Sequence, residues 1–168
     1  MALTYVAIAT TTVESGGAAD IEFTSIPATY TDLLVKLSAR GTRALTYEVI
    51  KIEFNGSTAN LSSRQLYGDG SAAGSSSSGT QIVFDTNAAN NTASVFGSHE
   101  IYIPNYAGST NKSVSVNSVM EQNGTTAYPE LVAGLWADTS AITSIKLLPA
   151  VANFAQYSTA TLYGIKNS

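Results

Sequence analysis

Residues 50–56 of the chain are Ile-Lys-Ile-Glu-Phe-Asn-Gly, and this stretch decides the fold class. Apolar and charged residues alternate up to Phe54, which is the pattern of a β-strand with one buried face. The Asn55-Gly56 pair that follows is a strong signal for a tight turn, because both residue types accept a positive φ. The stretch therefore predicts a β-strand that ends in a turn.

The same alternation recurs on both sides of this strand, and β-branched and aromatic residues fill the alternating positions. Proline residues at 27, 104 and 149 end three of the segments, since proline cannot donate to a β-ladder. Strands are predicted over residues 5–13, 21–26, 33–40, 50–54, 82–84, 95–103, 114–118, 131–136, 145–147 and 157–165.

Residues 33–40 have an alternative interpretation. A helix capped at Thr31 would also satisfy the spacing of Leu33, Leu34 and Leu37. We favour the strand, because Leu33 and Leu37 also belong to a period-two pattern in which Lys36 and Arg40 fall on the other face.

About nine or ten strands at a spacing of about 8–12 residues are typical of a sandwich or a barrel. We predict an all-β fold, an antiparallel two-sheet β-sandwich with jelly-roll-like connectivity, built as a single domain over residues 1–168. Residues 68–79, Gly-Asp-Gly-Ser-Ala-Ala-Gly-Ser-Ser-Ser-Ser-Gly, predict a flexible Gly/Ser-rich loop. No internal repeat is evident.

Charged residues make up only 12% of the chain, about half the usual share, and Ser, Thr, Asn and Gly take their place. Such a polar, uncharged surface loses little side-chain entropy when it is ordered against a neighbour. The net charge is −4, and no two of the eight basic residues are adjacent, which argues against binding to nucleic acid or to an anionic membrane. No stretch approaches the ~20 apolar residues of a membrane span.

This composition resembles that of exported proteins, yet Met1 to Tyr5 contain no basic region and no apolar run of secretory length. An exterior type of surface without an export signal fits a protein that is released by lysis. A signal peptide that has been removed would explain the composition equally well.

The residue types needed for common catalytic and metal sites are scarce. His99 is the only histidine, and in a strand its neighbour Glu100 points to the other face, so we expect a partly exposed structural histidine. Without cysteine, ordinary zinc sites are excluded. Asp69 and Asp85 each lie in segments with too few oxygen ligands for calcium and are predicted to stabilise turns. We predict no enzymatic activity, no metal and no cofactor.

Four stretches, residues 5–12, 23–33, 54–56 and 160–165, resemble a family of uncharacterised phage virion proteins, many from marine and cyanobacterial phages. The resemblance implies a small, non-enzymatic structural protein of the head (capsid decoration, cement or head fibre) or of the tail fibre. It also implies a location in the phage particle after synthesis in the host cytoplasm, with a major capsid or tail protein as partner.

We expect the chain to act by self-association, as a homotrimer, and by docking on the particle. The candidate partner contacts are Ser75, Ser76 and Ser77 in the Ser-rich loop, Tyr30 near Pro27, and Trp136. Tyr30 has a second interpretation as an anchor of its loop in the core, and Trp136 as a core or subunit-contact residue.

Two other functions remain open. Trp136 and the nine tyrosines could form a stacking platform for a glycan, as in a carbohydrate-binding module or the receptor-binding domain of a phage fibre. A secreted or surface adhesin domain whose export signal has been removed is the third possibility.

Overall fold

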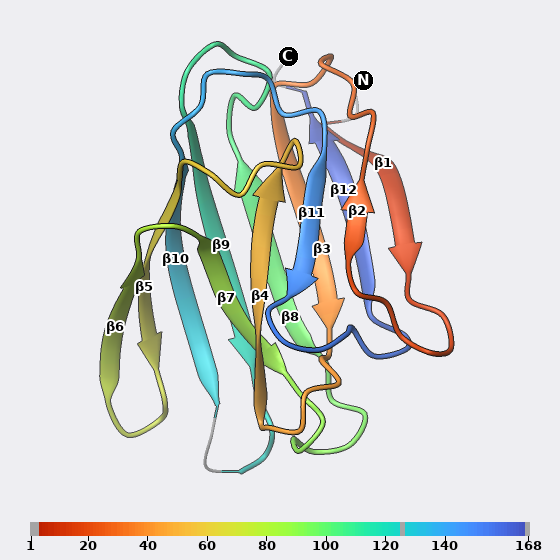
Figure 1. Cartoon of the computed structure of the whole chain (residues 1–168), viewed down its shortest axis with the longest axis vertical. Helices are drawn as coiled ribbons and strands as arrows, with labels where there is room; N and C mark the ends of the chain where they lie inside the picture. The colour runs from red at the N-terminus through yellow and green to blue at the C-terminus, as the bar shows by residue number, and fades with distance from the viewer. Residues whose placement is uncertain (1–3, 125–126, 167–168) are drawn as a thin grey trace.

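The computed structural model describes residues 4–124 and 127–166, and within them the ordered elements are twelve strands, with no helix (Figure 1). The strands are β1 (Tyr5–Thr12), β2 (Ile21–Phe23), β3 (Asp32–Ala39), β4 (Tyr47–Phe54), β5 (Leu61–Gly68), β6 (Ala73–Ser78), β7 (Ile82–Asn87), β8 (Gly97–Ile103), β9 (Lys112–Met120), β10 (Tyr128–Trp136), β11 (Ile145–Pro149) and β12 (Thr159–Ile165). All pairings between these strands are antiparallel.

The strands form two sheets that pack face to face, so the predicted β-sandwich is confirmed (Figure 1). The large sheet has eight strands in the order β1-β12-β3-β8-β9-β10-β5-β6, and the small sheet has four in the order β2-β11-β4-β7. The chain changes sheet at each step from β1 to β4, while the hairpins β5–β6 and β9–β10 both extend the large sheet.

One segment differs from the sequence prediction, and one alternative is decided. Residues 33–40 are extended, because β3 pairs with β12 on one side and with β8 on the other, so the helix alternative is wrong. The predicted flexible loop over residues 68–79 is also wrong for most of its length, since β6 forms a regular ladder with β5 from Ser63↔Ser78 to Gly68↔Ala73. The serine side chains of β6 are too small to add much packing, but the backbone of β6 still pairs with that of β5.

The core lies between the two sheets and consists of the inward-facing residue of each alternating pair. In β4, Ile50, Ile52 and Phe54 are each at most 1% exposed, as the opening pattern predicts. Asn55 and Gly56 then turn the chain with φ values of 52° and 68°. This turn does not close a hairpin within one sheet, because β4 belongs to the small sheet and β5 to the large one.

The large sheet is wider than the small one, and side chains of β5 and β10 reach the free edge of β7. An unpaired strand edge is a template for unwanted pairing, so its backbone groups need partners. Three side chains supply them: Ser63 donates to the Gln81 carbonyl (2.9 Å), Gln65 donates to the Val83 carbonyl (3.0 Å), and Glu130 accepts from the Asp85 N–H (2.9 Å). The sandwich is closed on this side by side chains.

Candidate functional site

Large apolar side chains lie exposed on the outer face of β5, β9 and β10, the face turned away from the core. The exposed fractions are 56% for Leu66, 50% for Val119, 57% for Leu131 and 40% for Leu135. Pro129 of β10 is exposed as well, and it lies between Val119 and Leu131 in the sequence. We call Leu66, Val119, Pro129, Leu131 and Leu135 the outer patch.

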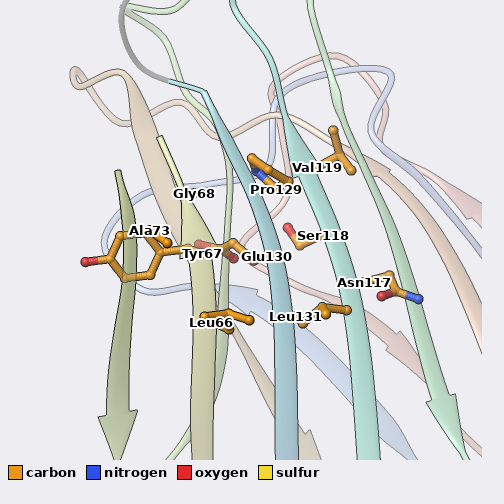
Figure 2. A pocket seen from close by; sticks show the side chains of 10 residues that line it. All are labelled: Leu66, Tyr67, Gly68, Ala73, Asn117, Ser118, Val119, Pro129, Glu130 and Leu131. Atoms are coloured by element: carbon orange, nitrogen blue, oxygen red, sulfur yellow. The ribbon is translucent and has the colours of Figure 1, made fainter. Parts of the chain in front are cut away.

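The strand register brings the outer patch together from three strands. Leu131 lies opposite Leu66 on β5, and Pro129 lies opposite Val119 on β9. Figure 2 shows these side chains around a groove of about 520 Å³. Apolar cross-strand pairs normally stabilise the buried face of a sheet, and here they lie on its open face.

The outer face of β5, β6, β9 and β10 carries little charge. Arg64 is the only charged side chain that β5, β6, β9 and β10, all fully described, leave exposed, since Lys112 and Glu130 are 0% and 6% exposed. The outer face of the small sheet instead carries four charged side chains, and one pair is joined at 3.6 Å (Glu22 with Lys146; the others are Lys51 and Glu53). The β3–β8 part of the large sheet is charged as well, since Lys36 and Glu100 form an exposed ion pair on its outer face.

The predicted contact residues Ser75, Ser76 and Ser77 lie on β6, the edge strand of the large sheet, next to the outer patch. All three are exposed, and Ser75 lies opposite Leu66. The Ser76 hydroxyl donates to the Gln65 side chain. An edge with neither lysine nor proline lacks two common barriers to strand pairing, so β6 can accept another strand.

The other two predicted contact residues lie elsewhere. Trp136 is 1% exposed and packs on Phe54 with the ring centroids 5.5 Å apart, so the prediction that it contacts a partner or a glycan is wrong and its core interpretation holds. Tyr30 is half-buried against the core, with the Lys166 ammonium 5.6 Å from its ring centroid. It is the loop anchor of the second interpretation.

His99 is buried, not partly exposed as we predicted, because it shares the inward face of β8 with Ile101 and Ile103. Its ring lies 2.9 Å from the Ser118 hydroxyl and 3.0 Å from the Thr86 hydroxyl. Burial lowers the pKa of His99 to about 3, so the imidazole is neutral. Neither of these two hydrogen bonds goes to a carboxylate, so His99, Ser118 and Thr86 do not form a hydrolytic triad. The bond to Thr86 instead joins the large sheet to the small one.

The acid pair formed by Asp85 and Glu130 leaves no sign in the sequence. They lie 45 residues apart on β7 and β10, and Glu130 is 6% exposed. Burial, together with the charge and hydrogen bond of Glu130, raises the pKa of Asp85 to about 7. Burial also raises the pKa of Glu130. Asp85 was predicted in a turn, but it belongs to the regular strand β7, whereas Asp69 does close a turn by accepting from Ser71 and Ala72.

Asp85 predicts a pH-dependent stability. Its pKa is raised from 3.8, so the folded protein binds more protons than the unfolded chain between about pH 4 and 7. The stabilisation from protonated Asp85 is present below pH 4 and is lost as the pH rises through 7. Asparagine does not titrate, so the Asp85→Asn variant does not lose this stabilisation as the pH rises. Relative to wild type, the free energy of unfolding of the variant should therefore increase by about 1–2 kcal/mol between pH 5 and pH 8.

Urea unfolding at both pH values measures this difference, with Asp20→Asn, at an exposed position, as the control. A difference between Asp85→Asn and wild type that stays constant from pH 5 to pH 8 would contradict the raised pKa.

Within residues 4–124 and 127–166, no helix is long and apolar enough to cross a membrane, and no three His, Cys, Asp or Glu side chains are grouped to hold a metal ion. Comparisons of the chain with family models, with curated proteins and with solved structures find no match. The geometry of the outer patch and of β6 therefore carries the argument about function.

Proposed function

We propose that this chain is a non-enzymatic structural protein of a phage particle, which associates with copies of itself through the outer patch and docks on a capsid or tail protein. The observation that carries the proposal is the apolar outer patch, which lies on a part of the large sheet with almost no exposed charge. The outer face of β5, β6, β9 and β10 has exposed leucines, a groove and a single exposed arginine, whereas the small sheet and the β3–β8 part of the large sheet carry ion pairs. An apolar, nearly uncharged face loses little on desolvation when it meets another protein.

The fold supports the same function. The half of the large sheet formed by β1-β12-β3-β8 and the small sheet β2-β11-β4-β7 have four strands each. At most steps between these eight strands, the chain crosses from one sheet to the other. We propose that this connectivity is a jelly roll enlarged by the β5–β6 and β9–β10 hairpins. The outer patch lies on these two hairpins. The strands that enlarge the proposed jelly roll are therefore the ones that carry the proposed contact surface.

A closed homotrimer is the assembly we propose, because a closed ring covers one patch and one β6 edge on each subunit. The carbohydrate-binding alternative depended on stacking by Trp136, and this ring lies in the core. Carbohydrate binding is therefore the second candidate function, and a titration with glucose tests it.

Leu131→Lys tests the proposed association. Leu131 is 57% exposed, so lysine can replace it without entering the core, but in an interface it would bury a charge. Sedimentation equilibrium should give a concentration-dependent oligomer for the wild type and association at least tenfold weaker for Leu131→Lys, a loss of about 1.4 kcal/mol or more.

Val151→Lys is the matched control, because Val151 is 68% exposed in the β11–β12 connection, away from the outer patch. It should associate like the wild type. A wild-type chain that stays monomeric at all concentrations up to hundreds of micromolar, or equal weakening by both variants, contradicts the proposal.

A further inference from the structure

A second cavity, of about 240 Å³, lies where the inner side of β5 and β10 overhangs the free edge of β7. It is on the opposite side of β5 and β10 from the outer patch, because neighbouring residues of a strand point to opposite faces. Tyr47 of β4, Tyr67 of β5 and Tyr128 of β10 line it, together with the acid pair Asp85 and Glu130. Three aromatic rings and two carboxyl groups from both sheets thus share one small space.

The Tyr128 ring stands at right angles to each of the other two rings. The Tyr128 centroid lies 6.4 Å from that of Tyr47 at an interplanar angle of 87°, and 6.0 Å from that of Tyr67 at 90°. Rings in this arrangement form the walls of a cage. They do not form the flat platform on which a sugar ring stacks.

The cavity is lined by two acidic side chains, Asp85 and Glu130. None of its lining residues, all within the described chain, is basic. Burial and then the charges of Asp85 and Asp69 raise the pKa of the Tyr128 phenol, which is the response expected next to negative charge. Aromatic faces add to the field, since the ring quadrupole places negative charge above and below the ring.

A cation already occupies the outside of this cage. The Arg43 guanidinium carbon lies 5.7 Å from the centroid of the Tyr47 ring, within the range of a cation–π contact. Its charge acts on Asp85 and opposes the rise of the Asp85 pKa. Arg43 does not line the cavity, so the space between the rings and the acid pair remains open to a second cation.

We propose that this cavity, the tyrosine cage, binds a small organic ammonium group, such as the end of an alkylamine. The volume is below the roughly 300–1,000 Å³ of pockets for drug-sized ligands, so one small group fits. The ammonium hydrogens would donate to the carboxylates of Asp85 and Glu130, and the rings would surround the alkyl carbons next to the nitrogen. This inference is independent of the proposed assembly.

Binding should be linked to the loss of a proton. Protonation of Asp85 removes a negative charge from the acid pair, and the pKa of Asp85 is about 7. The other charged or titratable groups that face the pair are Glu48 from β4, Arg43 and the three cage tyrosines. If an ammonium ion needs the ionised Asp85, its affinity should be about tenfold higher at pH 8 than at pH 6.

The test is a titration of the full chain with n-butylammonium, followed by two-dimensional NMR at pH 6 and pH 8. We expect saturable shifts confined to the cage residues and about tenfold tighter binding at pH 8. Asp85→Asn should bind equally at both pH values. Tyr47→Leu should weaken binding roughly fivefold at pH 8, while Tyr5→Leu, at a 56% exposed tyrosine outside the cage, should not change it.

Two neutral probes identify the other outcomes. Equal binding of n-butanol would show an apolar cavity without preference for a cation, and binding of glucose in place of butylammonium would show a sugar site. Either result overturns the proposal, as does the absence of localised shifts with butylammonium at both pH values. Retention of the wild-type spectrum outside the cage shows that each variant is folded.

Discussion

An Arg40→Met variant is expected to lose about 3–5 kcal/mol of stability, because four backbone carbonyls lose their hydrogen-bond donor. Arg40 follows β3 and is 9% exposed. Its guanidinium donates to the carbonyls of Thr92 and Val95 at 2.8 Å, Asn91 at 3.0 Å and Ala89 at 3.2 Å. A single planar side chain thus holds the whole connection between β7 and β8, and methionine keeps its length without its donors.

Urea unfolding measures the loss, with Arg64→Met as the matched control. Arg64 is exposed and donates to the carbonyl of the neighbouring Ser63, so its replacement should change the free energy of unfolding by less than about 0.5 kcal/mol. Equal stabilities of the two variants would mean that water replaces the guanidinium of Arg40.

Trp136→Ala is expected to cost about 3–5 kcal/mol, and Trp136→Phe much less. Alanine leaves a cavity beside Phe54, whose ring centroid lies 5.5 Å from that of Trp136. Phenylalanine keeps a ring there and also removes the indole N–H, which is buried without an acceptor. Burying an unpaired donor costs free energy, so its removal offsets part of the lost volume.

Far-UV circular dichroism follows the unfolding of both variants, because Trp136 is the only tryptophan and its fluorescence is lost on substitution. A Trp136→Phe variant as unstable as Trp136→Ala would show that the indole N–H has a partner in solution. The order of the two variants therefore tests the packing of this part of the core directly.

The alternation in the sequence predicted most of the strands, because burial between two sheets imposes a period of two. It missed β5 and misjudged β6, since these strands lie on the overhang of the large sheet. The ladder of β5 with β10 places Leu66 opposite Leu131, about 65 residues along the chain. Pairing at such a separation leaves no local signal.

The candidate site could be predicted only in part. In β10, Leu131 and Leu135 alternate with Val132 and Trp136, so both faces of the strand are apolar. In an antiparallel sheet with one buried face, this pattern is itself a signal for a second covered face, although it does not say which side is the core. His99 shares its alternation with Ile101 and Ile103, which was a usable signal for burial. Asp85 and Glu130 meet only through the fold.

The most direct test of the proposed function is the accessibility of residue 131 during association. The chain has no cysteine, so Leu131→Cys introduces a single thiol in the outer patch and Val151→Cys one outside it. We expect the rate of alkylation at position 131 to fall at least fivefold as the protein concentration rises through the association range, whereas the rate at 151 stays constant. Equal rates at both positions and at all concentrations would contradict an assembly through the outer patch.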